Sequence, residues 1–387
     1  MRDLWHLITG EYPPQRGGIA DYTAHLAAAL AGSGSEVHVW TTQGLETQAV
    51  DGVTVHRPAA SWALSELAHF DRALEAFPAP RRLLVQYAPN VWGYKGMNIG
   101  FCRWLHRRRS RGDDVRVMFH EVWYPWRLWD KPTRWALALG QRMMVRTLLE
   151  ACSSAYVSIP AWEPLLRASE KGPRRPIAWL PVPSTIAAAH DSSAVADLRR
   201  RLAPTGETIL GSFGTFGGMI GGMLAEILPR LLEHRDDRVG LLFGRGSDHF
   251  VARLVGSHPK LHGRLIAAGG LSPEEVSFHL QAIDLLVQPY PDGLTSRRTT
   301  LMAGLAHGVP TVSNLGALSE SVWMQGSHLA LAPRPNPAEI VEAVESLIAA
   351  PERFATLGRA GRELYRRMFA IERTVDAIRG SAVIGDG

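Results

Sequence analysis

The sequence predicts an α/β protein made of two Rossmann-like domains, each a doubly wound parallel sheet, that face one another across a cleft. A chain of 387 residues exceeds one ordinary hydrophobic core and suits two domains of about 150 to 200 residues. Short apolar runs alternate with helical patterns, which is typical of parallel sheets covered by helices on both faces. The alternation lapses at 181–207 and then restarts. We therefore expect domains at 1–183 and 184–387, with a last helix that can pack back on the first domain.

The first domain opens as a βαβ unit. An apolar run at 3–9 leads into the turn-rich segment 10–18, an Ala- and Leu-rich helix at 19–31 and a strand at 36–42. Further strands are expected at 53–57, 82–87, 115–120, 154–159 and 177–180. Helical patterns lie between them at 61–76, 97–111 and 131–151.

The second domain repeats this plan. The sequence predicts strands at 208–213, 239–243 and 264–267, with a glycine loop at 214–222 and a turn at 244–246. Helices are expected near 223–234, 248–256 and 273–282, and the final segment 337–380 is helical apart from breaks at Pro351 and Gly358. Ligands of such sheets bind beyond the carboxyl ends of the strands.

The segment from Asp284 to Pro310 has the pattern of an anion site. An apolar strand at 284–288 ends in a Pro- and Gly-rich loop, and a helix begins at Thr299. The unpaired N–H groups and the positive dipole end of that helix point back at the loop, where Arg297 and Arg298 stand. We expect an anion there. The alternative is an ordinary strand-loop-helix connection with a solvated pair of arginines.

The same segment resembles a known signature. GLTSRRTTLMAGLAHGVPTVSN, residues 293–314, resembles the C-terminal signature of GT-B glycosyltransferases of family 4, in which a Gly-containing loop enters a helix ending in Ala-x-Gly-x-Pro. Segment 12–42, with its early Gly-Gly, is similar to the start of these enzymes. Phe119-His120-Glu121 is similar to their strand-then-histidine element, which faces the donor sugar. The resemblance spans most of the chain.

Two departures from the family pattern stand in the second domain. The family usually has two glutamates separated by seven residues, and those positions hold Thr295 and Ala303 here. The family also places an Arg and a Lys in the first loop of this domain, but 213–222 contains no cation. We interpret the chain as a divergent subfamily in which arginines of neighbouring loops bind the diphosphate.

The resemblance implies a metal-independent, retaining transferase that moves a sugar from a UDP- or GDP-type nucleotide sugar to a hydroxyl of a glycan, lipid-linked or small-molecule acceptor. It implies no cofactor. We assign catalytic roles to His120 and Thr295. The expected donor and phosphate contacts are Gly17, Gly18, Gly214, Thr215, Arg245, Leu271, Ser296, Arg297, Arg298, Thr299 and Thr300. The expected acceptor contacts are Asp21, Tyr22, Glu121, Trp123 and Trp126.

Several alternatives stay open. His120 can instead be a half-buried ring whose hydrogen bonds are all made within the protein. Each tryptophan that follows it in the sequence can be an ordinary core residue. The missing glutamates favour, as the second hypothesis, a catalytically silent subunit that binds a nucleotide sugar or a partner enzyme. An epimerase or a phosphorylase is weaker still, because a phosphorylase needs a lysine for pyridoxal phosphate and the second domain offers only Lys260. No metal is expected, since the chain has no Asp-x-Asp.

The charge distribution bears on partners and compartment. Residues 1–180 hold 22 Lys and Arg against 16 Asp and Glu, much of the excess being at 103–111. We expect a weak peripheral contact of Arg107–Arg111 with an anionic surface, the alternative being a solvated helix end. Nucleic acid is not expected, because no recognition motif accompanies the charge. The opening lacks the plan of a signal peptide and no long apolar segment occurs, so we expect a cytoplasmic protein, peripheral at the inner membrane surface at most.

Overall fold

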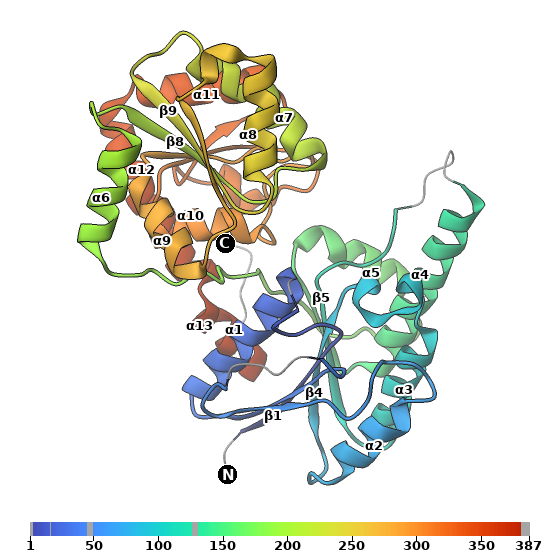
Figure 1. Ribbon diagram of the computed structural model, residues 1–387. Coiled ribbons are helices and arrows are strands. Elements are labelled where there is room, and N and C mark those ends of the chain that lie inside the picture. The colour runs from blue at the N-terminus through green and yellow to red at the C-terminus, as the bar shows by residue number, and fades with distance from the viewer. Residues whose placement is uncertain (1–2, 16, 45–48, 126–130, 381–387) are drawn as a thin grey trace. The chain divides into compact units, whose positions relative to one another are not determined.

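The computed structural model describes residues 3–15, 17–44, 49–125 and 131–380. The chain divides into two compact units (Figure 1). The first unit holds the described residues up to Pro181 and those of 371–380, and the second spans Val182–Ala370. The division lies two residues before the expected boundary, and the last helix belongs to the first unit.

The first unit is a parallel seven-stranded sheet in the order β3-β2-β1-β4-β5-β6-β7. Its strands are β1 (Leu4–Thr9), β2 (Glu36–Trp40), β3 (Val53–His56), β4 (Arg82–Tyr87), β5 (Asp114–Phe119), β6 (Ser154–Val157) and β7 (Ile177–Trp179). The direction of winding reverses between β1 and β4, so this sheet is doubly wound.

Helices of the first unit lie between these strands in the chain, except the last, which follows the second unit. They are α1 (Gly18–Gly32), α2 (Leu67–Glu75), α3 (Ile99–Ser110), α4 (Pro132–Ala151), α5 (Glu163–Ser169) and α13 (Ile371–Arg379), with short 3₁₀ turns η1 (Pro89–Trp92), η2 (Tyr94–Gly96) and η3 (Pro160–Trp162). Helix α13 packs against α1, where Arg379 Nη2 donates to the Ser33 carbonyl at 3.1 Å. Arg116 Nη1 also donates to the Ile378 carbonyl at 2.7 Å. These bonds attach α13 to α1 and to β5.

The second unit is a parallel six-stranded sheet in the order β10-β9-β8-β11-β12-β13. Its strands are β8 (Thr208–Phe213), β9 (Arg238–Phe243), β10 (Leu265–Gly269), β11 (Leu285–Val287), β12 (Thr311–Asn314) and β13 (Ala330–Ala332). The order is that of a dinucleotide-binding sheet, with its switch point between β8 and β11. The predicted fold class is thereby confirmed, although β13 was not predicted because three residues carry no periodicity.

Helices cover both faces of the second sheet. They are α6 (Ser192–Leu202), α7 (Gly218–Leu232), α8 (Ser247–Ser257), α9 (Pro273–Ala282), α10 (Thr299–His307), α11 (Pro337–Ile348) and α12 (Pro351–Leu364), with 3₁₀ turns η4 (Pro259–Leu261) and η5 (Ser321–Met324) and a π-turn η6 (Tyr365–Phe369). Apolar residues of α7, α8 and α11 form one core, and those of α6, α9 and α10 form the other. No helix of the described ranges is long and apolar enough to cross a bilayer.

Candidate functional site

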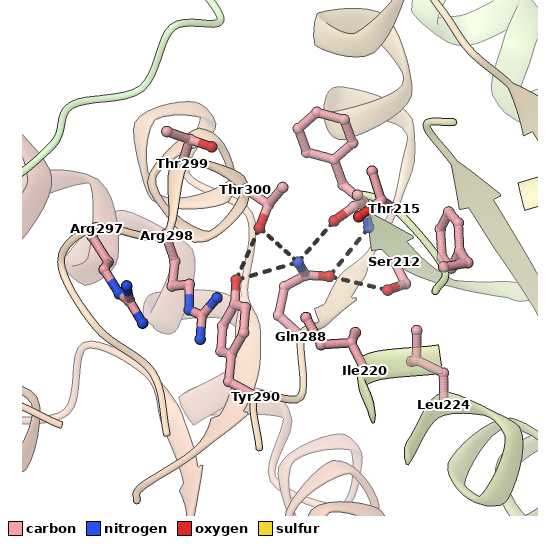
Figure 2. Close-up of a pocket in the computed structure, with 13 residues that line it drawn as sticks. Ser212, Thr215, Ile220, Leu224, Gln288, Tyr290, Arg297, Arg298, Thr299 and Thr300 are labelled. Carbon is pink, nitrogen blue, oxygen red and sulfur yellow. Dashed lines mark hydrogen bonds between the residues drawn. The ribbon is translucent and has the colours of Figure 1, made fainter. Parts of the chain in front are cut away.

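A cavity of about 220 Å³ lies at the switch point of the second sheet. It opens beyond the carboxyl ends of β8 and β11, which is where ligands bind in doubly wound sheets. Figure 2 shows its walls, formed by the loop after β8, the start of α7, the end of β11 and the start of α10. The lining residues are Ser212, Phe213, Gly214, Thr215, Phe216, Ile220, Leu224, Gln288, Tyr290, Arg297, Arg298, Thr299 and Thr300.

Two glycines bring the loops after β8 and β9 together. Gly214 and Gly244 have φ values of +152° and +114°, which side chains rarely tolerate. A Cβ atom on Gly244 would lie 2.2 Å from the Gly214 carbonyl oxygen, so only glycine permits this approach. Gly214, in the expected glycine loop, and Gly244, in the expected turn at 244–246, therefore have a packing role.

The buried amide of Gln288 joins three elements around the cavity. Its Oε1 accepts hydrogen bonds from Ser212 Oγ at 3.0 Å and from the Phe213 N–H at 3.2 Å. Its Nε2 lies 2.8 Å from the Phe213 carbonyl, 3.0 Å from Thr300 Oγ1 and 3.3 Å from Tyr290 Oη (Figure 2). The amide thus connects β8, β11 and α10. Gln288 and Tyr290 were not predicted as site residues, although polar residues directly after a buried strand are a signal of a ligand site.

Replacing this amide should loosen the cavity. We expect Gln288→Leu to lower the free energy of unfolding by about 2 to 3 kcal/mol, because Ser212 Oγ and the Phe213 backbone would keep buried polar atoms without partners. Chemical denaturation monitored by circular dichroism measures the loss. Gln325→Leu, at an exposed glutamine of the same unit, is the matched control. Equal stability of the two variants would contradict the role of Gln288.

Arg297 and Arg298 share one carboxylate, a contact that the sequence pattern does not predict. Arg297 Nη2 lies 3.1 Å from Asp292 Oδ2, and Arg298 Nη2 contacts the other oxygen. The Arg298 guanidinium lies over the Tyr290 ring, 4.8 Å from its centroid. Within the described ranges, Arg298 Nε is buried without a hydrogen-bond partner. The cluster keeps one net positive charge beside the start of α10.

The first turn of α10 adds to this positive potential. Arg298 occupies the N-cap position and Thr299 begins the helix, and no described side chain caps this end. Because Thr299 and Thr300 line the cavity, the positive end of the helix dipole is directed into it. An anion in the cavity would meet two guanidinium groups and a helix N-terminus, which together favour phosphate.

Ser296, expected at the donor, is instead bound to a buried glutamate. Glu320 Oε1 accepts from the Ser296 N–H at 2.8 Å and from Ser296 Oγ at 2.6 Å, and Trp323 Nε1 donates to Oε2 at 2.5 Å. Burial raises the pKa of Glu320, and these hydrogen bonds oppose that rise. This corrects the expectation that Ser296 contacts the donor. The N–H and the hydroxyl of Ser296 both bind Glu320, and these bonds hold the loop before α10 in place.

The two positions that lack the family's glutamates are buried. Ala303 belongs to the core on the α9 face, and Thr295 has no exposed surface. Thr295 Oγ1 has no hydrogen-bond partner within the described ranges. A side chain without exposed surface cannot touch a ligand in this conformation, so the catalytic assignment of Thr295 is corrected.

This burial reverses the expected effect of a substitution at Thr295. Thr295→Val should raise the free energy of unfolding by about 1 kcal/mol, because a methyl group replaces an unpaired buried hydroxyl of the same shape. Nucleotide affinity should stay within twofold of wild type. Thermal denaturation and calorimetry measure both quantities. A fall in nucleotide affinity would return Thr295 to the site.

The remaining donor contacts fall into two groups. The cavity brings together Gly214, Thr215, Arg297, Arg298, Thr299 and Thr300. Arg245 and Leu271 lie outside its lining. Arg245 is exposed in the loop after β9, and Leu271 packs against the core on the α9 face. Their assignment as donor contacts stays a prediction.

His120 stands at the end of β5 in the first unit. Its Nε2 lies 2.9 Å from Gln86 Oε1, and the Tyr22 ring packs edge-on at a centroid distance of 4.8 Å. Burial lowers the pKa of His120 to about 3. The ring is therefore neutral at neutral pH, which suits a hydrogen bond to a ligand and not general base catalysis.

The start of α1 already holds a carboxylate. Glu11 Oε1 accepts from the Ala20 N–H at 3.3 Å, and a Cβ atom on Gly17 would lie 2.2 Å from this oxygen. Glu11 thus fills the place where an anion would meet α1. The expectation that Gly17 and Gly18 bind phosphate is not met in this conformation, because a negative group occupies the position.

The acceptor residues are also only partly available. Tyr22 is buried against His120, so its assignment as an acceptor contact is corrected to a packing role. Asp21 and Glu121 are exposed. Trp123 is half-buried, with the Arg142 guanidinium 4.9 Å from its ring centroid. Trp126 lies outside the described residues.

Comparison with known proteins identifies the fold. No protein-family model and no curated protein matches the chain. Among solved structures, sucrose-phosphate synthase from Thermosynechococcus elongatus matches with a TM-score of 0.71 and 18% identity over 98% of both chains. Anabaena HepE in complex with UDP matches with a TM-score of 0.69 and 13% identity, covering 98% of this chain and 99% of that one. The glycosyltransferase WaaG of lipopolysaccharide biosynthesis matches with a TM-score of 0.66 and 15% identity, covering 97% and 100%. These neighbours are GT-B glycosyltransferases, so the chain has the GT-B fold.

Proposed function

We propose that this chain, which has the GT-B fold over its whole length, is a glycosyltransferase that uses a nucleoside-diphosphate sugar. The observation that carries the proposal is the cavity at the β8/β11 switch point, where two arginines converge with the start of α10, which no described side chain caps. Both arginines line this cavity, and the single positive charge that they keep beside Asp292 suits an anionic ligand there. Because the similar HepE structure is a complex with UDP, UDP is the nucleoside diphosphate to test first.

The proposed chemistry concerns the leaving group. When the sugar leaves, negative charge develops on the diphosphate. Arg297, Arg298 and the N–H groups of Thr299 and Thr300 form a wall that would stabilise this charge in the transition state. We further propose that the reaction retains the anomeric configuration and uses no metal, with a diphosphate oxygen taking the acceptor proton.

His120 has a defined part in this proposal. A neutral ring donates one hydrogen bond and accepts another, so His120 can orient a sugar hydroxyl without changing its charge. The bond to Gln86 and the packing of Tyr22 hold the ring in one orientation. Tyr22 and Gln86 are thus positioning residues for His120.

A second candidate function rests on one observation. The positions of both family glutamates are buried and lack carboxylates, and the Glu320 carboxylate is occupied by Ser296 and Trp323. A subunit that binds a nucleotide sugar without turning it over would tolerate this arrangement. The donor's sugar hydroxyls would then find fewer charge-assisted hydrogen bonds than in an active enzyme.

One experiment separates the two functions. Calorimetry with UDP, GDP and dTDP measures nucleotide binding, and hydrolysis of the corresponding sugars measures turnover. Binding of one nucleotide together with hydrolysis of its sugar form supports the transferase. Binding without turnover of any donor supports the silent subunit. Absence of binding to all three nucleotides would refute both.

A further inference from the structure

The basic segment of α3 lacks the features needed for a surface contact. Its apolar residues Trp104 and Leu105 are fully buried. Arg108 is also buried and pairs with Asp113, while Arg111 lies 3.1 Å from Glu75. The expected contact of Arg107–Arg111 with an anionic surface is therefore not supported, because the segment offers no apolar face and part of its charge is neutralised.

Helix α4 offers the apolar face that α3 lacks. Trp135, Leu139 and Met143 follow one another at intervals of four residues, which places them on one side of the helix. Their exposed fractions are 37%, 56% and 48%, whereas the buried residues of α4 lie on its other side. Scattered exposed apolar residues are normal, but an aligned series along one helix indicates an interaction surface.

A second element extends this surface. Met97 packs on α4, where a Cβ atom on Gly140 would lie 3.2 Å from its sulfur, and Met97 is itself 36% exposed. Tyr94, in the adjoining turn η2, is 59% exposed. Both Tyr94 and Lys95 have positive φ values, 49° and 53°, which are strained for residues other than glycine. Strained backbone is thus retained where an aromatic ring faces solvent.

Cations outnumber acids along α4 and its flanking residues. Residues 131–149 contain four cations and no acid, namely Lys131, Arg134, Arg142 and Arg146. Lys131, Arg134 and Arg146 are exposed, and Lys95 adds a further exposed cation from η2. One acid, Glu150, lies within 3.3 Å of Arg146 at the far end of the helix. An apolar face with cationic flanks and aromatic residues is the composition of a helix that lies in a membrane interface.

We propose that Tyr94, Met97, Trp135, Leu139 and Met143, the α4 face, bind the surface of a bilayer containing anionic lipid. The apolar side chains would enter the headgroup boundary while the lysine and arginine groups meet lipid phosphates. A second copy of this chain is a poorer occupant, because two such cation-rich faces would repel one another. The inference is independent of the proposed sugar transfer.

Vesicle flotation tests this assignment with the full chain. Wild-type protein should float with vesicles of equal parts phosphatidylglycerol and phosphatidylcholine, and remain in the bottom fraction with vesicles of phosphatidylcholine alone. Raising the salt concentration should release the protein from the anionic vesicles. Leu139→Glu with Met143→Glu should weaken binding to the anionic vesicles about tenfold or more, since apolar burial is lost and charge is reversed. The matched control is Met219→Glu with Met324→Glu, which changes exposed methionines of the second unit.

A second measurement does not depend on disruptive substitutions. Acyl chains brominated near the headgroup should quench tryptophan fluorescence of wild type more than that of Trp135→Phe, because Trp135 would lie in the interface. Lipid binding that Leu139→Glu with Met143→Glu leaves unchanged, or equal quenching in wild type and Trp135→Phe, would overturn the proposal. Light scattering measures self-association of the chain. If wild type self-associates without binding lipid, and only Leu139→Glu with Met143→Glu loses this association, the α4 face binds a second copy. That result would also overturn the proposal.

Discussion

Arg297→Ala combined with Arg298→Ala should weaken binding of a nucleoside diphosphate by about 2 to 4 kcal/mol, or roughly 30- to 1,000-fold. A charge-assisted hydrogen bond contributes about 1.5 to 3 kcal/mol before compensation by solvent. Both guanidinium groups line the cavity, and both are already held by Asp292. Little side-chain entropy is therefore lost when the ligand arrives, which favours the upper part of the range.

Calorimetry with UDP on the double variant measures this loss. The matched control is Arg230→Ala with Arg353→Ala, which removes two exposed arginines of the same unit that do not line the cavity. Long-range charge effects would appear in both proteins, whereas a direct contact would appear only in the first. An affinity within twofold of wild type in the Arg297 and Arg298 variant would remove the cavity from the phosphate-binding model.

Glu320→Ala should lower the free energy of unfolding of the second unit by about 3 to 5 kcal/mol, since the buried Ser296 N–H, the Ser296 hydroxyl and the Trp323 indole N–H would all lose their acceptor. Glu320→Gln should lose less, about 2 kcal/mol, because an amide keeps one acceptor oxygen and turns an N–H toward the indole. Urea denaturation of the full chain measures both values. The control is Glu342→Ala on α11, outside this contact network.

The pH dependence of stability gives an independent test of Glu320. Burial raises its pKa in the folded state, so the folded chain holds this proton more tightly than the unfolded chain does. The contribution of Glu320 to stability therefore falls as pH rises from its ordinary value of 4.5 through the raised value. Glu320→Ala should abolish this part of the pH profile, and an unchanged profile would contradict the assignment.

The sequence alone determined the fold class and the location of the candidate site. Apolar residues spaced as in strands alternate along the chain with apolar residues spaced as in helices, and this alternation predicted two doubly wound sheets. The spacing is informative because it depends on which face of each element is buried. The loop-to-helix segment before Thr299 was found in the same way, since proline, glycine and cap residues act locally. Arg297, Arg298, Thr299 and Thr300 do line the cavity.

Only the tertiary structure decided which polar groups at the site are available to a ligand. Ser296 is occupied by Glu320, 24 residues along the chain, and Arg297 and Arg298 share the charge of Asp292. The start of α1 is filled by Glu11. Local propensity sets where a helix begins, but the partner of a buried polar group depends on which distant segment packs against it. The hydrogen-bond partners of buried polar groups are therefore set by the folded chain, and the hydrophobic periodicity of the sequence does not predict them.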